Sequence, residues 1–139
     1  MAKMIQSAEE FVELRTSENP ELYTRAAQET APEEVWLDVI TRFPEMRVWV
    51  AHNKTIQTAI LKILATDSDW RVRHMVASKR KTEPVILEQL AKDIDEGVRL
   101  AVAKNPKTPL HVLEMLMHDQ WETIAKEAKE RIEQNSFKK

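Results

Sequence analysis

One set of residues recurs along the chain from Met46 to Asp119 at a constant step of 26 positions. An arginine, a valine-alanine pair, two leucines and an aspartate each return at this step. They are Arg47, Arg73 and Arg99; Val50, Val76 and Val102, each followed by alanine; Leu61, Leu87 and Leu113; Leu64, Leu90 and Leu116; and Asp67, Asp93 and Asp119. A fixed period of this length is typical of a stacked repeat array, in which each repeat buries its apolar face only against its neighbours.

Composition indicates that the repeats are helical. The chain of 139 residues has a single glycine, Gly97, and it is rich in alanine, leucine, glutamate and lysine. We therefore predict an all-α fold, namely a short right-handed α-α superhelix. The sequence has no apolar run long enough for a membrane span and no signal-peptide core, so a cytoplasmic protein is expected. The absence of cysteine excludes disulfides, thiolate metal sites and cysteine nucleophiles.

The spacing of start and stop signals predicts one helical-repeat domain over residues 1–139. Ser7 and Glu10 have the spacing of a capping box and begin a cap helix of about residues 8–16. We expect an N-terminal cap at 1–19, a divergent repeat at 20–43, regular repeats at 43–67, 67–93 and 93–119, and a C-terminal cap helix with a tail at 120–139. The divergent repeat matches the array if the step is shortened to 24 residues, which places Ala27 on Ala51 and Leu37 on Leu61. Residues 135–139 are expected to fray.

Each regular repeat is expected to contain two helices. The first helix of the repeat at 67–93 has Val72, Met75 and Val76 at i, i+3 and i+4, which predicts one apolar side. The second helix has a threonine-proline start signal, clearest at Thr108-Pro109. There we expect threonine to cap the helix and proline to occupy its first turn.

The string from Asp93 to Leu116 resembles the leucine-rich repeat variant, a relative of HEAT-type repeats. The residues that carry the resemblance are a Val-Arg-x-x-Val-Ala core, an Asn-Pro-x-Thr-Pro turn and a Leu-x-x-Leu pair. The resemblance covers roughly residues 20–130 and implies a solenoid that serves as a binding surface. Members of this family with an iron–sulfur cluster hold it in a cysteine-rich segment, which this chain lacks. We therefore expect no cofactor.

The arginine and aspartate ladder has a structural interpretation and a functional one. Arg73 and Arg99 each lie six residues after an aspartate, Asp67 or Asp93. A charged ladder of this kind could face a ligand. The favoured interpretation is that Arg47, Arg73 and Arg99 bind an aspartate or helix-end carbonyls of their own or the adjacent repeat.

Positions that vary between repeats are the better candidates for partner binding. On the second helices they are expected to line one surface of the superhelix. These candidates are Lys62, Glu88 and Glu114; Ile63, Gln89 and Met115; and Thr66, Lys92 and His118. Trp70 is equivalent to Glu96, so we expect it to be exposed and to serve as a hot spot. Trp36 is expected to be buried.

A compact basic cluster offers an alternative site. Arg71, Arg73, Lys79, Arg80 and Lys81 lie close together in the sequence and could contact phosphates of a nucleic acid. The acidic pI of about 6.1 argues against a strong polyanion binder, and a short charge run is more often a solvated turn.

Charge is divided unevenly along the chain. Residues 1–46 carry a net charge of −6, residues 47–81 carry +6 and residues 82–139 carry −2. An acidic lobe on a small bacterial-type repeat protein suits an immunity protein or inhibitor that masks a basic, nuclease-type toxin domain. The other hypotheses are a nucleic-acid-binding protein and a general interaction scaffold. The expected state is a monomer or a heterodimer with the partner.

Catalysis receives little support from the sequence. The histidines lack metal-ligand spacing with a third ligand, no serine lies in a nucleophile turn, and no glycine loop could hold phosphate. We therefore expect no enzymatic activity, no catalytic residues and no metal site.

Overall fold

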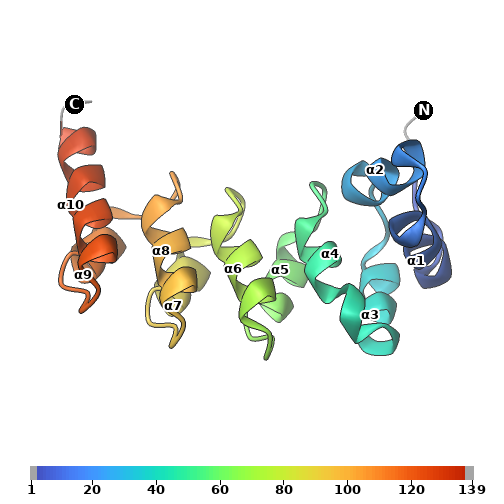
Figure 1. The fold of residues 1–139 in the computed structure, drawn as a ribbon, viewed down its shortest axis with the longest axis horizontal. Coiled ribbons are helices and arrows are strands. Elements are labelled where there is room, and N and C mark those ends of the chain that lie inside the picture. Colours follow the sequence, from blue (N-terminus) through green and yellow to red (C-terminus); the bar gives the residue numbers. More distant parts are fainter. Residues whose placement is uncertain (1–2, 137–139) are drawn as a thin grey trace. The chain divides into compact units, whose positions relative to one another are not determined.

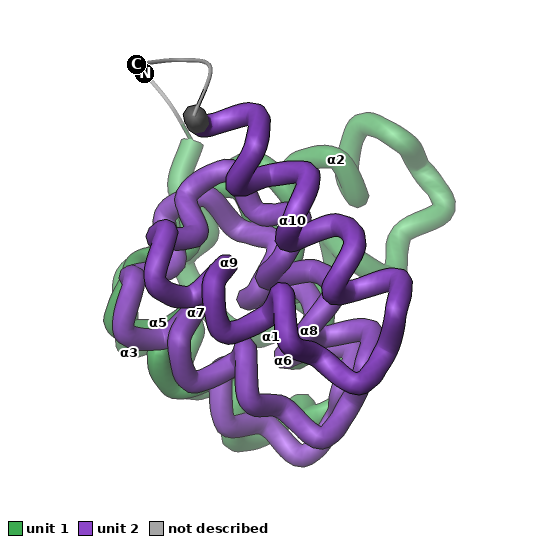
Figure 2. The backbone as a smooth tube through the Cα atoms, turned by 90° about the vertical axis from the view of Figure 1, so that its left-hand side faces the viewer, with its two compact units in different colours: residues 1–64 green, residues 65–139 purple. Residues whose placement is uncertain are grey.

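The computed structural model describes residues 3–136, and these residues are helical with short connections. The helices group into two compact units, unit 1 at Met1–Leu64 and unit 2 at Ala65–Lys139 (Figure 2). Unit 1 contains α1 (Ala8–Thr16), α2 (Pro20–Gln28), α3 (Glu33–Arg42), a 3-10 turn (Pro44–Met46), α4 (Arg47–His52) and α5 (Thr58–Leu64). Unit 2 contains α6 (Trp70–Ser78), α7 (Pro84–Leu90), α8 (Glu96–Lys104), α9 (Leu110–Leu116) and α10 (Glu122–Ser136) (Figure 1). The predicted all-α helical-repeat class is confirmed.

Capping explains where the first helices begin. The hydroxyl of Ser7 accepts a hydrogen bond from the Glu10 amide at 3.1 Å, and the Glu10 carboxylate accepts one from the Gln6 amide at 2.8 Å. This reciprocal arrangement is the predicted capping box, displaced by one residue on its second arm. Helix α2 begins at Pro20 behind Asn19, whose side chain accepts from the Glu21 amide. The segment before α1 is tied to the chain before α3 by a hydrogen bond from the Ile5 amide to the Thr30 carbonyl.

The core of unit 1 corrects the alignment of the divergent repeat. In α3 the buried residues are Val35, Trp36 and Val39, and in α5 they are Ile60, Leu61 and Leu64. Burial therefore pairs the two helices at a step of 25 residues, which also places buried Ala26 on buried Ala51. The expected step of 24 is wrong, because it would align Leu37, which is 41% exposed, with fully buried Leu61. Trp36 is buried as predicted and meets Phe11 of α1 edge to face at 5.2 Å.

Buried asparagines join the loop of one repeat to the preceding first helix. In unit 1 the Asn53 amide donates to the carbonyls of Ala26 and Glu29 at 2.8 and 2.9 Å. In unit 2 the side-chain amide of Asn105 makes a similar pair of contacts, to the carbonyls of Ala77 and Lys79. Each asparagine thus satisfies two carbonyls at the C-terminal end of a helix, where no intrahelical donor exists.

Unit 2 has a closely packed layer made by its first helices. Helix α8 packs along both α6 and α10, whereas α7 and α9 pack mainly on the first helices and scarcely touch each other. Ala77 and Ala103 are fully buried in this layer, as expected for small residues at a close approach. The first helices therefore form one closely packed layer of unit 2, and α7 and α9 lie against this layer.

The threonines in the turns before α7 and α9 do not cap the helix that follows them. Helix α9 begins at Leu110, and Pro109 precedes it with no side-chain cap. The Thr108 hydroxyl instead donates back to the Val102 carbonyl at 2.6 Å, and Thr82 makes the same bond to Val76. The expected helix cap at Thr108 is therefore wrong: threonine satisfies the end of the preceding helix and not the start of the next.

Helix α10 closes the C-terminal side of unit 2. Its apolar side buries Ile124 and Ala128, while Lys129 is exposed at the position where earlier repeats have a buried alanine. The helix extends to Ser136 and so includes Asn135 and Ser136, the first two residues of the segment expected to fray. The rest of the tail that was expected to fray lies outside the described residues. No helix among the described residues is long and apolar enough to cross a membrane.

Candidate protein-binding site on the first helices

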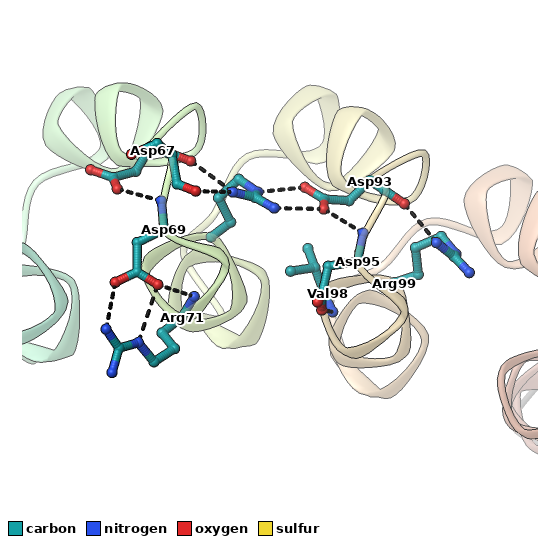
Figure 3. A network of polar contacts seen from close by, with 9 residues as sticks. Asp67, Asp69, Arg71, Asp93, Asp95, Val98 and Arg99 are labelled. Carbon is teal, nitrogen blue, oxygen red and sulfur yellow. Dashed lines mark hydrogen bonds and ion pairs between the residues drawn. The ribbon is translucent and has the colours of Figure 1, made fainter.

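The arginine ladder is occupied by contacts within the protein. Arg73 donates to both carboxylate oxygens of Asp93 at 2.8 and 3.1 Å, and it also donates to the carbonyls of Asp67 and Ser68 (Figure 3). The hydrogen bond to Asp93 raises the pKa of Arg73. Burial raises the pKa of Asp93, but the hydrogen bonds from Arg73 and from the Asp95 amide outweigh it, so this pKa lies below its ordinary value.

The same geometry recurs one repeat later. Arg99 donates to Asp119 at 2.8 Å and to the Asp93 carbonyl at 2.7 Å. Arg47 of unit 1 donates to the carbonyl of Ile40, near the end of α3. Each described arginine of the ladder therefore ties the start of its own helix to a neighbouring element, which leaves it poorly placed to contact a ligand.

Contacts within the protein make the basic cluster a poor site for phosphate binding. Arg73 is held at Asp93, and Arg71 forms an exposed ion pair with Asp69 at 3.0 Å. Arg80 and Lys81 are exposed in the turn after α6, beside Lys79. The five side chains thus do not form one uncommitted basic surface.

The predicted positions on the second helices are on the surface. In unit 2 they lie on α7 and α9 or just after those helices. Eight of the nine are exposed, and Glu88 is half-buried: Lys62, Ile63, Thr66, Glu88, Gln89, Lys92, Glu114, Met115 and His118. Glu88 lies 3.8 Å from His111 of α9. The described hollows of the protein lie elsewhere.

The tryptophans occupy different surroundings. Trp70 is 48% exposed at the start of α6, which confirms the expectation for its burial, and its ring meets His74 edge to face at 6.2 Å. Trp121 is similarly exposed just before α10. Trp49 of α4 is half-buried beneath the Arg15 guanidinium, which lies 3.5 Å from the ring centroid. Neither the stacked pair nor its position was predicted, because Arg15 lies in the cap helix, outside the periodic pattern.

Unit 1 has a hollow of about 480 Å³ between α1, α2 and α4. Its walls combine basic, aromatic and small side chains. The lining residues are Arg15, Tyr23, Thr24, Ala26, Ala27, Gln28, Trp49, His52 and Lys54. This volume falls in the range of small-molecule and side-chain pockets, roughly 300–1,000 Å³.

Unit 2 has a hollow of about 390 Å³ on the corresponding face of its first helices. It lies between α6 and α8 and is lined by residues such as His74, Ser78, Leu100 and Lys104. In repeat register, Ser78 and Lys104 are equivalent to His52 of the unit 1 hollow. The same helix face is therefore hollowed in both units, but the side chains on it differ from repeat to repeat.

The described residues contain no cluster of three or more His, Asp or Glu side chains that could hold a metal ion. In the hollows His52 and His74 lie beside the rings of Trp49 and Trp70, and the Ser78 hydroxyl donates to the backbone carbonyl of His74. The arrangement offers stacking surfaces and cationic donors, which are means of recognition.

Comparisons with known proteins agree with the repeat architecture. Searches of curated proteins and of solved structures find no match to this chain. The model of one family, the leucine rich repeat variant, matches residues 96–120, which run from the start of α8 past the end of α9. Residues 96–120 are therefore similar to a leucine rich repeat variant repeat, and they form a pair of helices as the neighbouring repeats do.

Proposed function

We propose that this protein is a non-catalytic binding module that contacts a protein partner through the exposed face of its first helices. The observation that carries the proposal is the coincidence of hollows with variable residues. Residues that repeat at fixed spacing, such as Arg73 and Asp93, already form contacts between repeats. The hollowed face instead differs in each repeat, as a surface selected for one partner would.

A finer version of the proposal is that the partner is a basic, nuclease-type toxin domain and that the protein inhibits it in the cytoplasm. The support is the net charge of −6 on residues 1–46. Some of the acidic side chains of this segment are engaged internally, because Arg25 pairs with Glu29, and Arg42 pairs with Glu9 and Asp38. Six exposed glutamates remain to attract a basic partner: Glu13, Glu18, Glu21, Glu33, Glu34 and Glu45.

The first experiment is affinity purification of the tagged protein from its native host after nuclease treatment, at about 0.3 M salt, where a few phosphate contacts fail. One stoichiometric protein is the expected result, and a basic one supports the inhibitor version. A preparation that binds no protein but carries nucleic acid when nuclease is omitted would instead favour the basic cluster as the site.

Paired variants then identify the face. On the first helices, Trp70→Ala and Lys104→Glu are expected to weaken the captured partner at least about tenfold, as hot-spot truncations do. On the second helices, Lys62→Glu makes the same charge reversal and Met115→Ala truncates an exposed apolar side chain, and both are expected to have little effect. The reverse ranking would assign binding to the second helices and contradict the proposal.

A further inference from the structure

The hollow of unit 1 has a charge opposite to that of the segment that builds most of it. Arg15, His52 and Lys54 line it, and no aspartate or glutamate does. Most of the wall comes from residues 1–46, where acidic side chains outnumber basic ones by 10 to 4. The hollow thus places Arg15 of this acidic segment beside His52 and Lys54 of the basic segment 47–81, with no acidic side chain in its lining.

The stacked arginine is oriented for recognition. The Arg15 guanidinium lies 3.5 Å from the centroid of the Trp49 ring, and no hydrogen bond or ion pair joins Arg15 to another described residue. Stacking occupies the face of the guanidinium and leaves its N–H edge available. That edge presents two parallel donors, which match the two oxygens of a carboxylate.

The aromatic wall is held in place beside these donors. Trp49 meets His52 edge to face at 5.8 Å and lies beneath the Arg15 guanidinium. Tyr23, Ala26 and Ala27 of α2 add apolar surface to the lining. A ligand that joins a carboxylate to a neighbouring apolar side chain would satisfy both parts of the hollow.

The surroundings favour a peptide over a polynucleotide. Exposed Glu13 and Glu18 flank Arg15 in the chain, and exposed Glu21 lies two residues from Tyr23. A nucleic acid brings a phosphate at every nucleotide and would be repelled by these carboxylates. A peptide with one or two acidic side chains can direct them at Arg15 and Lys54 without placing further charge at the rim.

We propose that the hollow between α1, α2 and α4 binds an acidic peptide segment, with a glutamate or aspartate carboxylate on Arg15 and an adjacent apolar side chain against Trp49 and Tyr23. This inference rests on the proposed protein-binding function and names the chemistry that one part of the partner contributes.

The test is an NMR titration of the full-length protein that follows the indole Nε1–H signals of its tryptophans. The probe is an acetylated and amidated pentapeptide, Ala-Glu-Leu-Glu-Ala, and its control is the same peptide with glutamine in place of glutamate. The Trp49 signal, assigned with Trp49→Phe, is expected to move saturably with the glutamate peptide, while the exposed Trp121 signal stays in place. The glutamine peptide is expected to bind at least about tenfold more weakly, since charge-assisted pairing is lost.

Variants separate the site from general effects of charge. Arg15→Gln and Lys54→Gln are each expected to weaken the glutamate peptide at least about fivefold, whereas Arg80→Gln removes an exposed arginine outside the hollow and leaves binding unchanged. The dispersion of the backbone spectrum shows directly that each variant is folded. If Arg15→Gln unfolds the protein, Lys54→Gln carries the test.

Three results would overturn the proposal. They are equal shifts with the glutamine peptide, no shift of Trp49 at about 10 mM peptide, where even a millimolar site is filled, and a shift with hexathymidylate but none with the peptide. Failure of the proposed function looks different, since affinity purification would then yield no protein partner. A captured partner that binds Arg15→Gln as tightly as wild type leaves the proposed function standing and removes this hollow from it.

Discussion

Arg73 at the start of α6 binds Asp93 ahead of α8 through two hydrogen bonds, and the same guanidinium donates to the Asp67 carbonyl ahead of its own helix. One side chain thus connects the beginnings of two successive first helices. Arg99 repeats the connection to Asp119. Because each repeat is stabilised mainly by its neighbours, these pairs couple adjacent repeats directly.

We expect Arg73→Ala to lower the free energy of unfolding by about 3 kcal/mol, because it leaves the Asp93 carboxylate desolvated without its partner. The side chains of Arg73 and Asp93 are only 13% and 9% exposed. The measurement is urea unfolding at pH 7. Arg71→Ala is the matched control: its ion pair with Asp69 is exposed and is expected to contribute little. Similar losses in the two variants would show that the Arg73 pair has no special role.

Acid is expected to weaken the same junction. The pKa of Asp93 is lowered in the folded protein, so its carboxylate stabilises the fold at pH values above the unfolded pKa of about 3.9. This stabilisation is lost as pH falls from that value through the lower folded pKa. Asp93→Asn should therefore be less stable than wild type at pH 7, and the difference should shrink toward pH 3. A difference that stays constant from pH 7 to pH 3, measured by urea unfolding, would contradict this assignment.

Asn105 should be a second stability determinant. Its buried amide donates to the carbonyls of Ala77 and Lys79, and its oxygen accepts from the Lys107 amide at 2.8 Å. We expect Asn105→Ala to cost about 2–3 kcal/mol, since several polar groups lose their partners in a buried place. Asn105→Asp should cost at least as much, because it replaces the donor with a carboxylate facing two carbonyls. Lys107→Ala, which keeps the backbone contact, is the control and should be near neutral.

Periodicity predicted what the repeats share. The positions of Val76, Leu87 and Asp93 recur because each repeat makes the same contacts to its neighbours, and so the helices and the ladder could be read from spacing alone. Alignment failed at Leu37, where spacing favoured a step of 24 and burial required 25. The divergent repeat lacks the periodic polar residues that fix the alignment. Only the burial of Trp36 and Val39 shows the correct step.

Local signals were less reliable where two helix ends compete for one side chain. Thr108 precedes a proline and a helix, which is a start signal, yet its hydroxyl donates to the carbonyl of Val102 in the preceding helix.

The unit 1 hollow could not be predicted from the sequence for a different reason. Arg15, Tyr23 and Trp49 come from three helices with no common spacing, so only the fold brings them together.

The cap of α8 leads to a prediction about the single glycine. A Cβ on Gly97 would lie 2.9 Å from an oxygen of Asp95, the residue that caps α8 by accepting from the Val98 amide. In α6 the equivalent residues are Asp69 and Arg71. Arg71 has a Cβ, and there the aspartate accepts its hydrogen bond from the Arg71 amide. The Asp95 carboxylate can therefore rotate to the arrangement of Asp69 and keep a cap. We expect Gly97→Ala to stabilise the protein by about 0.5 kcal/mol through helix propensity.

A double-mutant cycle in urea checks this expectation. If Asp95 rotates freely, Gly97→Ala should have nearly the same effect in the wild-type and Asp95→Ala backgrounds, and Asp95→Ala alone should cost about 1 kcal/mol for the lost cap. A substitution that stabilises only in the Asp95→Ala background would mean that the methyl group displaces the carboxylate and that α8 requires glycine for its cap. In that case the hydrogen bond from the Val98 amide to Asp95 could not be replaced by the arrangement that caps α6.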